Sequence, residues 1–283
     1  MFKLKGHSGC KLELHEVSLG NRFVRKVSKS EEYNERLRKQ CYKQESFKKA
    51  KKINAPKILR KGETDGLFFF DMEYVGGQDF IEFTSACQTS SIDEIAETLI
   101  RFIKRNLRKS NYIDFPLEKY RKKVLDTLSS VSIQEKITDK ELFSLKKFLL
   151  ERDFSVLFPE GYCHGDLTFS NIIASSKNER LTFIDFLDQP FNSPIHDIVK
   201  IRQDSFFNWS LNLYSGNIDS TKVKIAWRHI DDLVIESFFS DKFTLHYYDI
   251  LQVLNFLRIL NYTTEERMTK FVLECMWKII EKR

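Results

Sequence analysis

The segment His164-Gly165-Asp166-Leu167-Thr168-Phe169-Ser170-Asn171 is followed, after a short apolar stretch, by Phe183-Ile184-Asp185-Phe186. Three side chains in these two segments suit one reaction. Phosphoryl transfer needs a carboxylate that orients and deprotonates a hydroxyl, and oxygen ligands that hold Mg²⁺ against a triphosphate. Asp166 is the candidate base, and Asn171 and Asp185 are the candidate metal ligands.

The residues between these segments predict how the two meet. Ile172-Ile173-Ala174 and Leu181-Thr182-Phe183-Ile184 are typical of two short buried strands, joined through residues 175–178. Such a hairpin would place Asn171 and Asp185 close together. The order H-x-D-x-x-x-x-N and then D-F is typical of the catalytic and metal-binding loops of kinases. A polar loop before an ordinary hairpin would explain the first motif, but not the aspartate that follows on an apolar strand.

Length and composition fit a soluble globular protein. The chain has 283 residues, which suffices for one large domain or two lobes, and 42% of them are hydrophobic and 30% charged. The net charge of +6 would favour an anionic cosubstrate. Lysine and arginine are spread along the chain without a recognisable RNA or DNA module, so we expect no nucleic-acid partner.

Cysteine usage and hydropathy predict a cytoplasmic protein. The five cysteines show no C-x-x-C pair, which argues against a zinc site or a disulfide framework. The N-terminus lacks the apolar core of a signal peptide, and no apolar run reaches the ~18 residues of a spanning helix. We therefore expect no integral membrane association.

The N-terminal residues predict a nucleotide-binding hairpin. Gly6-His7-Ser8-Gly9 precedes an alternating strand, Lys11–Val17, and a return strand follows at Arg22–Val27. The candidate nucleotide ligands in the turn are Gly6, Ser8 and Gly9, because glycine lets backbone amides approach phosphates closely. An ordinary hairpin turn is the alternative explanation.

Lys26 is the candidate phosphate lysine on the return strand. Since side chains alternate with period two, Val24 lies on the same face and could cover the adenine. Arg25 and Lys29 are alternatives. The position of Lys26, after a glycine turn and before a helix, favours it.

A charged amphipathic helix is expected from Glu31 to about Lys52. Glu45 is its candidate partner for Lys26, with Glu35 as the alternative. Leu67–Val75 predicts a strand, and Gly76-Gly77 ends it. We therefore expect a β-rich nucleotide-binding lobe at residues 1–76 and a helical lobe with the acceptor site at 77–283. Within the latter, capping boxes at Ser91-x-x-Glu94 and Thr138-x-x-Glu141 predict two helix starts.

Taken together, the chain resembles the aminoglycoside phosphotransferase and choline kinase-like family over about residues 6–204. The matching segments, in order, are Gly6-His7-Ser8-Gly9, Lys26, Glu45, Met72-Glu73-Tyr74-Val75-Gly76-Gly77, His164 to Asn171, Phe183-Ile184-Asp185-Phe186 and His196-Asp197-Ile198. The resemblance implies an α+β, two-lobed protein kinase-like fold with ATP between the lobes and Mg²⁺ as cofactor. It implies that the Glu73 carbonyl and the Val75 amide bind adenine, and that Asp197 is structural.

Two departures from the family pattern are visible. Phe169-Ser170 stands where proline and glycine are often found, and no glycine follows Asp185-Phe186-Leu187. Neither departure removes a reactive group, so an active enzyme is expected.

A protein kinase and an inactive nucleotide-binding scaffold are the alternatives to a small-molecule kinase. A protein kinase is disfavoured because Gly165 replaces the arginine of H-R-D and because Asp185 and Asp197 are too close for a long activation and peptide-docking segment. An inactive nucleotide-binding scaffold is disfavoured by the joint presence of Lys26, Asp166, Asn171 and Asp185.

The acceptor is expected to be a small molecule with a hydroxyl group. A sugar used in cell-envelope or capsule synthesis is the leading hypothesis, by resemblance to sugar-pathway members over Asp185–Asp204. Choline or ethanolamine is the next, with cation–π contacts from aromatic residues, and an aminoglycoside, held by acids, is the third. The aromatic candidates are Trp209, Phe206, Phe207 and Tyr248, and the acidic ones are Asp231-Asp232, Asp241 and Asp249.

Overall fold

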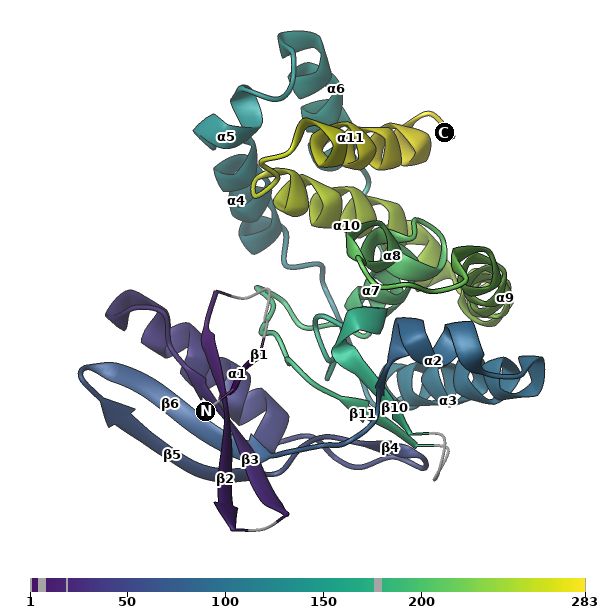
Figure 1. The fold of residues 1–283 in the computed structure, drawn as a ribbon. Helices are drawn as coiled ribbons and strands as arrows, with labels where there is room; N and C mark the ends of the chain where they lie inside the picture. The colour runs from purple at the N-terminus through teal and green to yellow at the C-terminus, as the bar shows by residue number, and fades with distance from the viewer. Residues whose placement is uncertain (1, 5–8, 19, 176–179, 283) are drawn as a thin grey trace. The chain divides into compact units, whose positions relative to one another are not determined.

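The computed structural model of the chain describes residues 2–4, 9–18, 20–175 and 180–282. An antiparallel sheet dominates the N-terminal part and helices dominate the C-terminal part (Figure 1). This arrangement confirms the expected α+β class. In the parts of the chain that are described, no helix is both long and apolar enough to cross a membrane.

The elements follow one another in this order. In the N-terminal half they are β1 (Phe2–Leu4), β2 (Lys11–Ser18), β3 (Asn21–Val27), η1 (Glu31–Tyr33), α1 (Asn34–Glu45), β4 (Ile53–Asn54), β5 (Ile58–Thr64), β6 (Leu67–Glu73), β7 (Gln78–Asp79), α2 (Phe80–Ala86), α3 (Thr89–Leu107), β8 (Asn111–Ile113) and α4 (Leu117–Leu128). The remainder are α5 (Val131–Gln134), α6 (Asp139–Leu150), β9 (Phe158–Glu160), η2 (Phe169–Asn171), β10 (Ile172–Ser175), β11 (Arg180–Phe183), α7 (Ile195–Ser205), α8 (Trp209–Leu213), α9 (Ser220–Phe238), α10 (Lys242–Leu260) and α11 (Glu266–Ile280).

The chain divides into two compact units. The first consists of residues 1–98, 164–188 and 210–226, and the second of residues 99–163, 189–209 and 227–283. This grouping differs from the expected division after residue 76, because β11 pairs with β4 in parallel and β10 pairs with β7. These pairings attach residues 164–188, which contain the candidate base and the candidate metal ligands, to the N-terminal residues. The expected division into two functional lobes stays a prediction.

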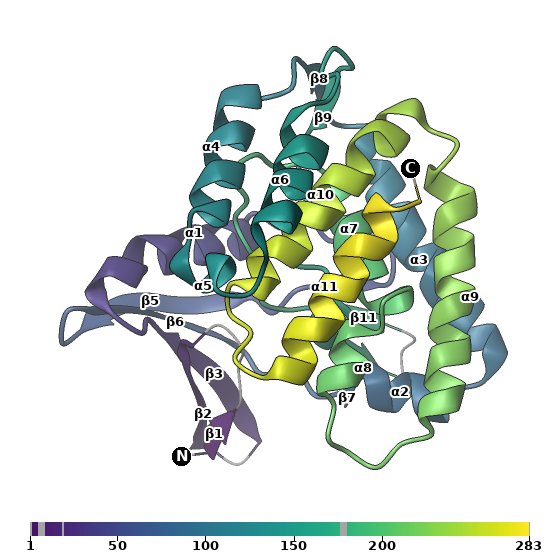
Figure 2. The same ribbon diagram turned by 90° about the horizontal axis from the view of Figure 1, so that it is seen from above.

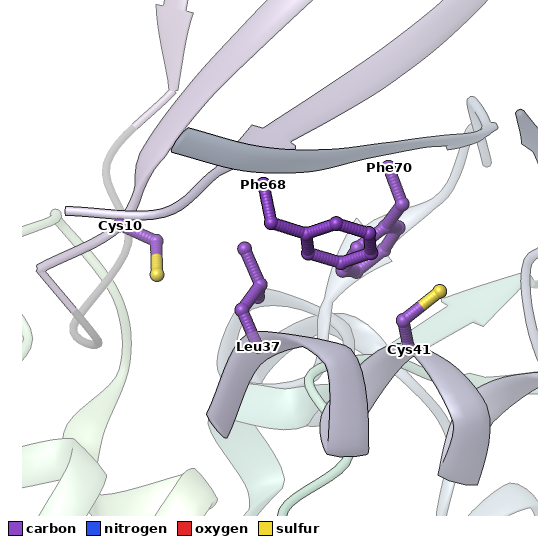
Figure 3. Packing of buried hydrophobic residues seen from close by; sticks show 5 residues of the cluster. All are labelled: Cys10, Leu37, Cys41, Phe68 and Phe70. Atoms are coloured by element: carbon purple, nitrogen blue, oxygen red, sulfur yellow. The ribbon is translucent and has the colours of Figure 1, made fainter. Parts of the chain in front are cut away.

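The first unit is built on a five-stranded sheet of order β1-β2-β3-β6-β5. Its strand β6 is almost continuously apolar because both faces of the strand are covered. Phe68 and Phe70 pack with Cys10 and with Leu37 and Cys41 of α1 (Figure 3). Between them, Phe69 faces the other way and lies under the Arg25 guanidinium, 4.1 Å from the ring centroid. The sheet and α1 thus share one small core.

A second sheet in the first unit has the order β4-β11-β10-β7. Its centre is the antiparallel β10–β11 pair, in which Ile172 faces Phe183 across the strands. The expected hairpin is therefore confirmed at both strands, while residues 176–179 of its turn lie outside the described residues.

The second unit is helical and has an aromatic core. Its helix α10 contacts α4, α6, α7 and α11, and Figure 2 shows α10 running between its neighbours. Phe115 stacks on Tyr247 with ring centroids 4.8 Å apart and packs edge-on against Phe158 and Tyr120. Thr138 caps α6 through the expected capping box with Glu141, which is confirmed.

Two expected element boundaries are wrong. The helix predicted to reach about Lys52 ends at Glu45, and Lys52 itself has a left-handed φ of 65°. Phe47, just beyond the helix, packs on Phe186 with centroids 5.5 Å apart, so a tertiary contact ends the helix earlier than its charge pattern suggests. Helix α3 begins at Thr89 rather than at the box that Ser91 opens.

Candidate functional site

The β10–β11 hairpin brings the two candidate metal ligands to one end of the second sheet. Asn171 immediately precedes β10, and Asp185 lies two residues beyond β11. The Ile184 N–H donates to the Asn171 carbonyl across the hairpin at 3.0 Å. The expected proximity of the two segments is confirmed, and its cause is local: a short antiparallel pair returns the chain to its starting point.

His164 connects the segment of the candidate base, Asp166, with the segment of the candidate metal ligand, Asp185. Its Nε2 lies 3.0 Å from the Ile184 carbonyl, to which it donates, and its Nδ1 accepts from the Asp166 N–H at 3.2 Å. The ring packs on Phe186 with centroids 4.3 Å apart. Complete burial lowers the pKa of His164 to about 4, so the ring is neutral, as these two hydrogen bonds require.

Asn171 also orients the candidate base. Its Nδ2 donates to the backbone carbonyl of Asp166 at 2.8 Å and to the carboxylate Oδ2 at 3.0 Å. The amide nitrogen is thereby turned toward Asp166, and the amide oxygen is the atom of Asn171 suited to a cation.

Lys26, on β3, contacts the other candidate metal ligand, Asp185. Its side chain is 5% exposed, and its ammonium donates to Asp185 Oδ1 and, at 3.1 Å, to Gln40 Oε1. Val24, Lys26 and Ser28 are all buried, as period two predicts, so the expected shared face of Val24 and Lys26 is confirmed.

The expected ion pair between Lys26 and Glu45 is wrong. Glu45 accepts from Lys61 at 2.7 Å, on an exposed edge of α1. The helix turns by ~100° per residue, so Glu45 lies about 140° around the axis from Gln40. Gln40 is on the buried face, with Leu37 and Cys41. A neutral amide therefore stands where an acid was expected.

The backbone is left-handed at two positions in the site. Asp185 has a φ of 61°, in the left-handed region that residues other than glycine adopt infrequently. Gly165 has a φ of 87°, and a Cβ there would lie 2.0 Å from the Leu187 carbonyl oxygen. Glycine is therefore required at 165, and an arginine in the manner of H-R-D would not fit.

Lys43 is a site residue that sequence reasoning missed. It is buried on α1, one turn after Gln40, and donates to the Leu187 carbonyl at 2.7 Å. Its ammonium lies 3.1 Å from the position of a Cβ at residue 165. Extending the buried face of α1 from Gln40 by three residues would have found it.

The remaining nucleotide candidates are placed only in part. Gly6 and Ser8 lie outside the described residues. Gly9, just before β2, has a left-handed φ of 74°. Glu73 ends β6 and its N–H donates to the Lys57 carbonyl at 2.9 Å, while Val75 lies in the connector beyond. Their roles toward a nucleotide stay predictions.

Two of the aromatic candidates for choline recognition, Phe206 and Tyr248, already contact a cation of the protein. In the second unit, the Arg202 guanidinium lies 5.0 Å from the Phe206 ring centroid and 4.9 Å from that of Tyr248. Phe207 packs edge-on against Phe256, and Trp209 stacks on Phe271. The expectation of an open cation–π site is therefore wrong for Phe206 and Tyr248, because Arg202 occupies their faces.

Three of the acidic candidates for an aminoglycoside pocket are engaged as well. Asp231 is fully buried and makes a bidentate pair with Arg202, at 2.8 and 3.1 Å. Asp232 pairs with Arg228, and Asp241 caps α10 through the Thr244 N–H. Asp231 thus serves the fold of the helical unit, so the expected acidic pocket is wrong for it. For Asp232, which pairs with Arg228 in solvent, and for Asp241 a role toward a substrate stays a prediction.

Comparisons with known proteins agree on one family. The sequence model of the phosphotransferase enzyme family matches residues 12–229. A search of curated protein sequences found no match.

Several solved structures have a similar fold, at low sequence identity. They include a Haemophilus somnus protein assigned as a fructosamine-3-kinase (TM-score 0.59, 14% identity, 100% of this chain and 90% of that chain). The GDP complex of aminoglycoside 2'-phosphotransferase-IIIa gives a TM-score of 0.55 at 17% identity, covering 96% and 91%. Plasmodium vivax ethanolamine kinase gives 0.52 at 14%, covering 99% and 81%. These similarities confirm the two-lobed protein kinase-like fold.

Proposed function

Because the chain belongs to the phosphotransferase enzyme family, we propose that it is an ATP- and Mg²⁺-dependent kinase that phosphorylates a hydroxyl group of a small molecule. One observation carries this proposal. Asp166, Asn171, Asp185 and Lys26 come from three separate segments of the chain within the first unit. Asn171 donates to Asp166, Lys26 donates to Asp185, and the Ile184 N–H donates to the Asn171 carbonyl and so links the two pairs. A polar loop before a hairpin would not require the buried lysine, and a nucleotide-binding scaffold would not require Asp166.

The donor set fits Mg²⁺. Asp185 offers a carboxylate and Asn171 an amide oxygen, and hard oxygen ligands are what Mg²⁺ selects. Asp185 already accepts from the Lys26 ammonium, so its carboxylate is placed to receive a positive charge. Bound there with the triphosphate, Mg²⁺ would supply charge neutralisation on the phosphate oxygens.

Other groups of the protein are proposed to bind the acceptor and the rest of the nucleotide. Asp166, oriented by Asn171, would position the acceptor hydroxyl and take its proton. Lys26, steadied by Gln40, would bind phosphate oxygens of the nucleotide. Gly9, Val24, and the backbone of Glu73 and Val75 are the proposed contacts of the remaining nucleotide, together with Gly6 and Ser8.

A sugar is the acceptor we favour. The similarity to a protein assigned as a fructosamine-3-kinase supports a sugar-like acceptor. Ethanolamine and an aminoglycoside, the substrates in the names of two other similar structures, are alternatives. They are weakened because Arg202 occupies the aromatic faces and pairs with Asp231. A role in cell-envelope or capsule synthesis stays a prediction.

The test is nucleotide-dependent phosphate transfer by wild-type protein and the Asp166→Asn variant. The substitution keeps the shape of the side chain and removes the base, so turnover should fall by ~10²–10⁴-fold. Affinity for Mg·ATP, measured by titration calorimetry, should stay within about twofold. Near-normal turnover of the variant would remove Asp166 from the mechanism.

A further inference from the structure

Helix α1 contacts the segment of the candidate metal ligand through two neighbouring side chains. Gln40 and Lys43 are three residues apart, so they lie next to each other on the helix surface. Gln40 accepts from Lys26, which donates to Asp185. Lys43 donates to the carbonyl of Leu187, two residues beyond Asp185, at 2.7 Å. The helix and residues 164–188 both belong to the first unit, so these contacts lie within one compact part of the chain.

The Lys43 ammonium lies where the segment of the candidate base meets the segment of the candidate metal ligand. The Leu187 N–H donates to the His164 carbonyl at 3.1 Å and joins the two segments through the backbone. The Leu187 carbonyl approaches Gly165 so closely that a Cβ there would lie 2.0 Å from its oxygen. Lys43 donates to this same oxygen, and its Nζ lies 3.1 Å from the position of that Cβ. The ammonium is therefore adjacent to the residue that directly precedes Asp166.

The charge of Lys43 also acts on the segment of the candidate base. The residue is only 7% exposed, so water screens its charge weakly. Burial is the main cause that lowers the pKa of His164, and the positive charge of Lys43 lowers that pKa further. Lys43 thus influences this segment through its charge as well as through its hydrogen bond to Leu187.

This cation takes a place that a different residue fills in regulated protein kinases. There, the H-R-D arginine supplies a positive charge directly before the catalytic aspartate, and an activating phosphate fixes its position. In the present chain, residue 165 is a glycine, and the space beside it contains an ammonium from α1. A backbone carbonyl, that of Leu187, accepts from this ammonium. The cation beside the base segment is therefore held without a phosphate.

We propose that Lys43 is a positioning residue for the phosphoryl transfer, and that it supplies from α1 the positive charge that the arginine before the catalytic aspartate supplies in protein kinases. It fixes residues 164–166 against residues 185–187 and so holds Asp166 in place relative to the metal ligands. The inference rests on the proposed function, because a base has to be positioned only if a hydroxyl is phosphorylated.

The first experiment tests the positioning itself and needs no substrate. Hydrogen exchange of the backbone amides of Leu187 and Asp166, which both donate to His164, is followed by NMR spectroscopy. In Lys43→Met, which keeps the side-chain length but neither donates nor carries a charge, both amides should exchange at least about tenfold faster, since hydrogen bonds to charged groups are the stronger ones. Lys39→Met is the matched control, because Lys39 is an exposed lysine of the same helix, and it should leave both rates unchanged.

The second experiment measures ADP release at saturating Mg²⁺ with glucose, ethanolamine and kanamycin as acceptors. On the acceptor that the wild-type protein uses best, Lys43→Met should lower kcat at least about tenfold and change the KM for ATP less than about threefold, since Gln40 still contacts Lys26. Lys43→Arg keeps the charge and should recover most of the lost kcat, and Lys39→Met should match the wild-type protein. Lys43→Gln loses the charge and keeps a donor, so it should show smaller changes in the same direction, and it replaces Lys43→Met if that variant does not fold.

The outcomes separate this inference from the proposed function. Unchanged exchange of Leu187 and Asp166 in Lys43→Met overturns the positioning role, even if Asp166→Asn is inactive. Equal losses of kcat in Lys43→Met and Lys43→Arg, or a KM for ATP that rises as much as kcat falls, also overturn it, because general loosening of α1 would produce them. If exchange quickens only in the Lys43 variants while the wild-type protein phosphorylates no acceptor, the kinase assignment fails and the role of Lys43 in fixing the two segments stands.

Discussion

Lys26 is held by one charged partner and one neutral partner. Asp185 accepts from its ammonium, and Gln40 takes the place in which sequence reasoning expected Glu45. Asp185 is also the candidate metal ligand. When a cation binds there, the Gln40 contact is the one that would remain to hold the lysine in place.

The contribution of Gln40 can be measured by truncation. Gln40→Ala removes one hydrogen bond to a charged group, worth about 1.5–3 kcal/mol, so kcat/KM for ATP should fall by at least about tenfold. Gln40→Glu should restore most of it, because a carboxylate also accepts from an ammonium. Glu45→Gln serves as the control, since Glu45 contacts Lys61 instead. A larger loss in Glu45→Gln than in Gln40→Ala would restore the original pairing.

His164 makes the stability of the fold depend on pH. Its pKa, lowered to about 4 by burial, is below the ordinary value of 6.5, so between these values the unfolded chain binds more protons than the folded one. This contribution to stability is present above pH 6.5 and is lost as the pH falls to about 4. It amounts to about 3 kcal/mol.

The corresponding variant is His164→Asn, whose amide can donate and accept as the neutral ring does. Denaturant unfolding between pH 7 and pH 4 should show a shallower decline in the free energy of unfolding than for the wild-type protein. Parallel curves for the two proteins would mean that His164 does not carry this pH dependence.

The β10–β11 hairpin is the element that brings the two proposed metal ligands together from positions separated in sequence. It connects Asn171 to Asp185, and the absence of a Cβ at Gly165 leaves room for the Leu187 carbonyl two residues further along. Lys43 then secures Leu187 from α1. The hairpin and its two neighbouring segments thus act as one unit around the carboxylate.

Removal of the Asp185 carboxylate should make ATP binding independent of Mg²⁺. Wild-type protein should bind ATP tightly only with Mg²⁺, because Mg²⁺ binds best when phosphate oxygens and waters complete its shell. In calorimetric titrations, Asp185→Ala should bind ATP weakly and equally with and without Mg²⁺. Asp188→Ala, three residues further along, should keep the metal dependence; the reverse result would identify Asp188 as the ligand.

For the molecule as a whole, the spacing of the motifs bears on regulation. The interval from Asp185 to Asp197 is too short for an activation segment. A Cβ at residue 165 would also collide with the Leu187 carbonyl, so this position cannot take the H-R-D arginine that binds an activating phosphate in regulated protein kinases.

The enzyme should accordingly be active as it is expressed, without prior phosphorylation. Phosphatase-treated and untreated protein should show equal turnover with small acceptors, and neither should phosphorylate casein or a histone mixture. Transfer to protein alone, or activity that disappears on phosphatase treatment, would favour the protein-kinase alternative.

The sequence alone was sufficient for the features that depend on local order. The strand pair β2–β3, the Thr138 capping box, the shared face of Val24 and Lys26, and the meeting of Asn171 with Asp185 all follow from period-two alternation, cap chemistry and a short hairpin. Each of these involves residues near one another in the chain, so side-chain pattern and backbone geometry determine them together.

The tertiary structure decided which distant side chains meet. Whether Gln40 or Glu45 faces Lys26 depends on the rotation of α1, which is set when Leu37 and Cys41 pack on Phe68 and Phe70. In the same way, the burial of Arg202 with Asp231 turned apparent ligand residues into parts of the core. Helix rotation and core packing depend on the free energy of many contacts at once, and no single stretch of sequence contains them.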